Sequence, residues 1–84
     1  AVAPGSAATR RSISQGKARL VLMAEDASSA QLDKIRRTMR KRIIPQVLLG
    51  NRATLGAAIG KAPITAVAVT DASLAGRLLE SIDG

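Results

Sequence analysis

The sequence predicts an α/β sandwich, in which helices cover both faces of a small sheet. Residues 18–24 (ARLVLMA) and 64–70 (ITAVAVT) are short and almost continuously apolar, which is typical of strands that are buried on both faces. The segments around them repeat apolar residues every three or four positions, as helices with one buried face do. Alternation of the two patterns along one chain is typical of α/β domains, and we expect right-handed crossovers between parallel neighbours.

A glycine and a run of apolar residues predict the first helix and the first buried strand. A short helix is predicted over residues 6–15, closed by Gly16, because glycine readily adopts the left-handed conformation that ends a helix. The buried strand at residues 18–24 comes directly afterwards.

The second helix has a clear start and a clear stop. Ser28 with Gln31 three residues later is a capping-box pattern, and Asp26 lies just before it as a further cap candidate. Pro45 is expected to end the helix. Its apolar stripe consists of Leu32, Ile35, Met39 and Ile43.

The second half of the chain repeats the alternation. A third strand is predicted over residues 45–50, and a helix over residues 51–59 with Leu55 and Ile59 on one face and Gly60 after it. The strand at residues 64–70 leads to a last helix, residues 72–81, which Asp71 opens. This helix is expected to bury Leu74, Leu78 and Ile82.

Charge favours a polyanionic partner. Thirteen basic residues against six acidic ones give a net charge of +7 on 84 residues, which suits nucleic acid best. An anionic membrane is the competing partner, but no apolar run approaches the ~20 residues of a membrane span. No stretch has the pattern of a signal peptide, so the cytoplasm is the expected location.

The composition also limits the chemistry. The chain contains neither histidine nor cysteine, so the commonest proton shuttle, the strongest nucleophile and thiolate metal ligands are all missing. We therefore expect no enzyme, no metal and no cofactor. Glu25 and Asp26 are not a catalytic pair, because adjacent strand residues point to opposite faces. Asp26 is expected to cap a helix, and Glu25 to reach basic neighbours or a base amino group.

A dense basic run lies off the apolar stripe of the second helix and is expected to form its outer face. Its functional interpretation is a phosphate-contacting surface, and the alternative is a solvated face favoured by the negative end of the helix dipole. The two interpretations weigh evenly at this point. The run comprises Lys34, Arg36, Arg37, Arg40, Lys41 and Arg42.

The motifs together resemble a known family. The ordered phrases GSAATRRSISQGKARLVLMAEDAS, LLGNRATLGAAIGKAP and AVAVTD resemble the kink-turn RNA-binding family of large-subunit ribosomal proteins, of archaeal type with bacterial relatives, and most of all its bacterial branch. The resemblance extends over residues 2–82. It implies a three-layer α/β/α sandwich around a small mixed sheet, with AVAPG matching a strand, and one RNA site built from two loops.

The first loop departs from the family pattern. The resemblance places a G-x-N-E-x-x-K motif on Gly5, Ala7, Ala8 and Arg11, so glycine and the positive charge remain while Asn and Glu are replaced by alanine. Methyl groups cannot pair with base edges, whereas phosphate contacts carry little sequence information. We therefore expect RNA affinity with weakened kink-turn specificity. The second loop falls on Lys61, Ala62, Pro63 and Ile64.

The front of the chain also departs from the family, whose members carry an earlier helix before the strand matched by AVAPG. We expect an apolar face to be left open by this difference, covered by a second copy or by residues outside this sequence. The wording ISQGKARLVLMAEDAS also resembles the C-terminal half of bacterial proteins that fuse this domain behind a small basic domain of the YlxR type.

Two functions are therefore weighed. The first is a non-enzymatic RNA-binding module of the ribosome or of transcription termination and antitermination, formed by residues 1–84 as one domain. The second is a protein-interaction domain on a degenerate RNA-binding fold that docks an acidic partner. Candidate RNA contacts are Gly5, Arg10, Arg11, Lys17, Glu25, Gly56, Lys61, Pro63 and Ile64.

Overall fold

The computed structural model describes residues 2–40, 42–58 and 63–83, with the side chains of the last two excepted. Helices and strands alternate along the chain in the predicted order, preceded by the strand that the family resemblance implied. The elements are β1 (Val2–Pro4), α1 (Ser6–Ser14), β2 (Leu20–Met23), α2 (Ser29–Thr38), β3 (Gln46–Leu48), α3 (Arg52–Ala58), β4 (Ala66–Val69) and α4 (Ala72–Asp83).

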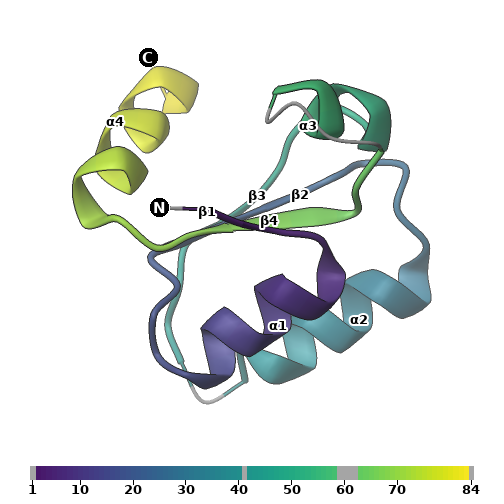
Figure 1. Ribbon diagram of the computed structural model, residues 1–84, viewed down its shortest axis with the longest axis horizontal. Coiled ribbons are helices and arrows are strands. Elements are labelled where there is room, and N and C mark those ends of the chain that lie inside the picture. Colours follow the sequence, from purple (N-terminus) through teal and green to yellow (C-terminus); the bar gives the residue numbers. More distant parts are fainter. Residues whose placement is uncertain (1, 41, 59–62, 84) are drawn as a thin grey trace.

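The elements form three layers, as expected. Helices α1 and α2 lie side by side on one face of the sheet, and α3 and α4 lie on the other face (Figure 1). The strand order is β1-β4-β2-β3, with β4 antiparallel to both β1 and β2 and with β3 parallel to β2. The predicted α/β/α sandwich with a small mixed sheet is therefore confirmed.

Strand register gives the sheet two distinct ends. β1, β2 and β3 finish where β4 begins, because Pro4 lies opposite Val67 and Met23 lies opposite Ala66. We call this the glycine end, since Gly5 and Gly50 follow β1 and β3 there. At the other end β2 begins and β4 finishes, with Leu20 opposite Val69. We call it the arginine end, for the arginines described below.

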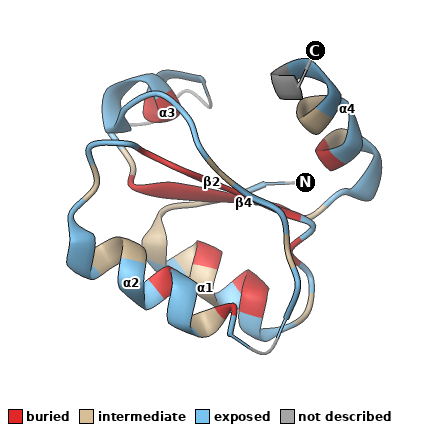
Figure 2. Ribbon diagram, turned by 180° about the vertical axis from the view of Figure 1, so that it is seen from behind, coloured by how far each residue is buried: buried red, intermediate tan, exposed pale blue. Residues whose placement is uncertain are grey.

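The two central strands hold the core together. Every residue of β2 and β4 is buried (Figure 2), so the continuous apolarity that predicted strands covered on both sides was correct. Val21 and Met23 point toward α1 and α2, where they meet Ala66 and Ala68 of β4. Alanines on this face of β4 let α1 lie close to the sheet, which suits a core without aromatic side chains.

Helix α2 ends earlier than predicted. Its last residue is Thr38 and Met39 is its C-cap, so the expected continuation through Ile43 to Pro45 is wrong. The amides of Arg40 and Arg42 donate to carbonyls three residues back, which tightens the chain into turns. The chain has to leave the helix here because β3 pairs in parallel with β2, and the Val21 amide donates to the Pro45 carbonyl. Ile43 is fully exposed and Ile44 packs on the core in its place.

Side-chain caps position three helices. Ser28 accepts a hydrogen bond from the Gln31 amide, as the capping-box pattern predicted. Asp26 is also a cap, but of α3 rather than α2, because its Oδ1 accepts from the Arg52 amide at 2.8 Å. Asp71 opens α4 by accepting from the Leu74 amide at 3.0 Å, as expected. This hydrogen bond holds the pKa of the Asp71 carboxyl below its ordinary value.

Predicted apolar positions that can be followed in the second half lie in the core. Leu55 is buried, and Leu74 and Leu78 of α4 pack on the same cluster. Ile59, Gly60 and the Ile82 side chain lie outside the described residues. In the ranges the structure describes, no helix combines the length and apolarity that crossing a membrane requires.

Large apolar side chains are exposed at four described positions, Val2, Ile43, Leu48 and Leu49. Val2 lies on β1 and Leu48 on β3, which are opposite edges of the sheet. These positions do not form one continuous face. An open apolar face covered by a second copy therefore stays a prediction.

Candidate nucleic-acid interface

The glycine end is organised around the turn from β1 into α1. Gly5 has φ 94° and ψ 158°, a region of backbone conformation that is essentially restricted to glycine. Its amide donates to the Ala66 carbonyl at 2.8 Å, which ties the start of α1 to the start of β4. Among the residues that the structure describes, and apart from the two chain neighbours of Gly5, no atom lies within 4 Å of the position that a Cβ on Gly5 would take. The described part of the chain therefore leaves room beside this turn.

Main-chain hydrogen bonds connect the other segments of this end. The Ala24 amide donates to the Thr65 carbonyl and the Glu25 amide to the Gly50 carbonyl, each at 2.8 Å. The Thr65 hydroxyl donates to the Gln31 side-chain oxygen at 3.0 Å, which links β4 to the first turn of α2. The starts of α1 and α2 and the start of β4 are therefore fixed relative to one another.

Four predicted site residues meet at the glycine end. Gly5 and Glu25 lie there, Pro63 is exposed, and Ile64 is half-buried against the core on the α3 side. The Ile64 amide also donates to the Arg52 carbonyl, so the approach to β4 is attached to α3. Lys61, the predicted phosphate contact of this loop, lies outside the described residues.

The two arginines of α1 differ in exposure. Arg11 is exposed, whereas Arg10 is half-buried. The Arg10 Nε is shielded from solvent and finds no hydrogen-bond partner among the residues that the structure describes. Ala7 is exposed and Ala8 half-buried in the first turn of the same helix. Arg11 is therefore the freer of the two to meet a ligand.

Two further predicted site residues, Gly56 and Lys17, have different surroundings. Gly56 is buried within α3, which fits close helix packing better than contact with RNA. Lys17 is exposed, but it lies at the arginine end, two residues before Arg19, whose amide donates to the Val69 carbonyl. The structure thus separates Lys17 from Gly5 along the strand direction.

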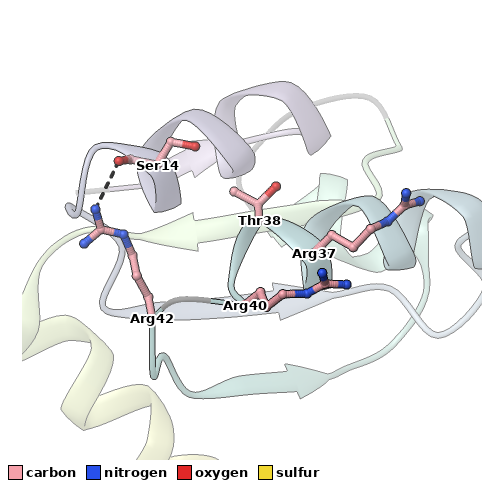
Figure 3. Close-up of a pocket in the computed structure, with 5 residues that line it drawn as sticks. All are labelled: Ser14, Arg37, Thr38, Arg40 and Arg42. Carbon is pink, nitrogen blue, oxygen red and sulfur yellow. Dashed lines mark hydrogen bonds between the residues drawn. The ribbon is translucent and has the colours of Figure 1, made fainter.

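Sequence reasoning missed two features. The Thr65–Gln31 hydrogen bond joins residues 34 positions apart, and no local pattern announces it. Arg42 was counted on the outer face of a helix, yet it lies beyond α2 and its Nη2 donates to the Ser14 carbonyl of α1 at 3.3 Å (Figure 3). The sequence did not show that α2 ends at Thr38, and it therefore did not show that Arg42 lies outside the helix.

Known proteins share the fold and the sequence features of this chain. A solved structure of a protein of unknown function from Bacillus halodurans has the same fold, with a TM-score of 0.90 and 29% identity, covering 99% of this chain and 84% of that one. Residues 1–78 match the Ribosomal protein L7Ae/L30e/S12e/Gadd45 family. The chain belongs to this family. The resemblance read from the sequence phrases is confirmed.

A curated bacterial protein is also similar to this chain. The chain is 37% identical over 73 residues to the RNA-binding protein YlxQ of Bacillus subtilis (strain 168), which corresponds to 87% of this chain and 73% of that protein. The L7Ae-type match covers α1, the sheet and most of α4, and so includes both ends of the sheet described above.

Proposed function

We propose that this protein is a non-enzymatic RNA-binding module, and that the glycine end is where it contacts RNA. The observation that carries the proposal is the turn at Gly5, where no non-neighbouring atom of the described residues lies within 4 Å of the position of the missing Cβ, on a chain of net charge +7. A polyanion is attracted to such a charge, and a turn without a side chain lets an RNA backbone approach closely. The similarity to a relative named as an RNA-binding protein supports the same partner.

The contacts at this end favour phosphate over base edges. Arg11 is exposed on α1 and supplies a charge that can reach a phosphate group. Ala7 and Ala8 occupy the positions where the family motif would place Asn and Glu, and both carry only a methyl group. We therefore propose affinity that depends on charge, with the kink-turn no longer preferred over other folded RNA.

Ribosomal RNA and nascent transcripts are the natural candidates for the target. The family match to ribosomal proteins supports the first, and the resemblance to the YlxR-type fusion supports a link to transcription termination or antitermination. Both targets are cytoplasmic in bacteria, so we propose the cytoplasm as the location.

The test compares three RNAs: a kink-turn, the same RNA with its sheared G·A pairs broken, and a plain duplex. We expect similar affinities for all three and a steep fall with added salt, because each neutralised phosphate releases counterions. Affinity that stays flat with salt would contradict the proposal. A stoichiometric acidic protein recovered after nuclease treatment, with no RNA affinity, would favour the protein-docking alternative instead.

A paired substitution sharpens the test. Ala7→Asn together with Ala8→Glu restores the side chains of the family motif in the first turn of α1, where a carboxylate is also favoured by the helix dipole. We expect the doubly substituted protein to prefer the intact kink-turn by ~10-fold or more, the size of one good bidentate base contact. An unchanged ratio would show that alanine at these two positions is not what weakens specificity.

A further inference from the structure

A second charged surface lies at the arginine end. A row of three adjoining hollows lies there: Arg37 and Arg40 line both the first and the second, and Arg42 lines both the second and the third. We call it the arginine groove. Its arginines are Arg19, Arg36, Arg37, Arg40 and Arg42.

Separate segments build the groove. Arg36 and Arg37 come from the last turn of α2, Arg40 and Arg42 from the turns after it, and Arg19 from the residue before β2. Arg42 turns back toward α1 to reach the Ser14 carbonyl, while Arg37 and Arg40 extend away from it (Figure 3).

Gly16 makes room for this arrangement. A Cβ at Gly16 would lie 3.0 Å from Nη1 of Arg42, which is tighter than ordinary side-chain contacts allow. The absence of a side chain therefore lets the Arg42 guanidinium lie against the end of α1. Lys17, a predicted phosphate contact, follows directly and is exposed beside the groove.

The charges of the groove are not neutralised from within. Asp33 is the one carboxylate among its described lining residues, and its carbonyl rather than its side chain accepts from the Arg37 Nε, at 3.4 Å. In the described parts of the chain the one ion pair within 4.0 Å is Arg52–Asp26, which lies at the glycine end. Each guanidinium has five N–H donors, so most donors of the groove face solvent.

The helix dipole does not explain the whole cluster. It favours cations in the last turn of α2, which accounts for Arg36 and Arg37. Arg19 and Arg42 are outside that helix, and their convergence on the same groove has no such cause. Several like charges held together repel one another unless an anion lies between them.

We propose that the arginine groove binds the sugar-phosphate backbone of a second RNA segment, at the end of the sheet opposite the glycine end; this rests on RNA being the ligand. Guanidinium groups bind phosphate in a bidentate manner, and several of them along a groove match a chain of phosphates. A protein partner would need an apolar centre to its interface. Ile43 is the one large exposed apolar side chain that the groove offers among the described residues.

The two surfaces are separated by the length of α1. Its nine residues span about 14 Å, since a helix rises about 1.5 Å per residue. One RNA that touches both ends therefore has to run along or around α1. We expect an RNA long enough to do so to bind more tightly than a short one of the same sequence.

The first test maps contacts on the native protein by NMR titration with a plain RNA duplex. The amides of Gly5 and Ala66 report on the glycine end, and those of Gly16 and Arg40 report on the groove. Perturbation of both sets would support the second surface. Perturbation of the first set alone would overturn it while leaving the proposed function intact, and a lack of response at both ends would contradict both.

The second test removes charge. Arg37→Gln with Arg40→Gln is expected to lower duplex affinity by roughly tenfold at moderate salt and to reduce the salt slope by about 0.7–0.9 per lost contact. Arg77→Gln on α4 also removes an exposed arginine, away from the groove, and serves as the control. A salt slope per lost charge equal to that of the control would overturn the proposal. So would groove amides that respond to polyglutamate or to anionic lipid vesicles but not to RNA.

Discussion

The glycine end and the arginine end of one small sheet are built by different means. At the glycine end, main-chain hydrogen bonds such as Gly5 to Ala66 and Ala24 to Thr65 hold the segments, and the turn from β1 into α1 has no side chain at Gly5. At the arginine end, long side chains from separate segments surround a groove, and they are attached by few contacts such as Arg42 to Ser14.

Because the two ends are built differently, we expect them to respond to different substitutions. A surface that depends on backbone shape is sensitive to substitutions that alter φ and ψ. A surface that depends on charge tolerates backbone strain elsewhere but weakens as ionic strength rises. The two ends can therefore be disabled separately, and the substitutions below are ordered by the size of the expected effect.

Gly5→Ala should have the largest effect on stability and should disable the glycine end alone. The conformation at Gly5 is strained for any residue with a Cβ, at a cost of about 2 kcal/mol in the free energy of unfolding. Urea denaturation measures the loss. Gly76→Ala is the matched control, because Gly76 lies inside α4 with open space around it, and there alanine should stabilise by about 0.5–1 kcal/mol. Equal effects at both positions would contradict the role given to Gly5.

Thr65→Val should cost about 1 kcal/mol of unfolding free energy, because it removes the hydrogen bond to Gln31 while keeping the volume of the side chain. This bond joins α2 to β4 at the glycine end. Thr70→Val, beyond the other end of β4, should change stability by less than about 0.5 kcal/mol. A Thr65 variant as stable as the Thr70 variant would show that the bond does not hold the glycine end together.

Two substitutions of Asp26 separate the stability that comes from capping α3 from the stability that comes from the ion pair with Arg52. Asp26→Ala should destabilise by about 1 kcal/mol, because the amide at the start of α3 loses its acceptor. Asp26→Asn keeps the cap and loses only the exposed pair with Arg52, which should cost less than about 0.5 kcal/mol. Thermal unfolding of the two variants decides between cap and charge, and the interpretation fails if they lose the same stability.

The smallest effect concerns pH at the arginine end, where Asp71 opens α4. Since the folded pKa of Asp71 is lowered, its contribution is present above the unfolded pKa and is lost as pH falls through the folded pKa. We expect the melting temperature to fall slightly below about pH 4, and Asp71→Asn to flatten this part of the profile. An unchanged profile in that variant would assign the acid sensitivity to other carboxyl groups.

Local patterns predicted most of the elements correctly. Continuous apolarity located β2 and β4, and Ser28 located the start of α2, because burial and capping depend on residues close together in the sequence. The end of α2 was not predictable in the same way. Its stripe continues to Ile43, and the helix stops at Thr38 because the chain must turn to pair β3 with β2.

The candidate site was likewise predicted only in part from the sequence. Gly5 and Glu25 were singled out from the sequence, and the structure brings them to one end of the sheet. Lys17 was placed with them on charge alone, whereas strand register puts it at the opposite end. Charge composition shows that cations are present, but it does not show on which side of the molecule they lie.

The sequence by itself determined the layered α/β architecture, the excess of positive charge and membership of the family, because periodicity, composition and ordered phrases are properties of the linear chain. Only the tertiary structure decided that Arg19 and Arg42 share a groove and that Gly5 adjoins Ala66. These juxtapositions depend on strand order and on where a helix stops. Both are set by contacts between segments that lie far apart in the chain.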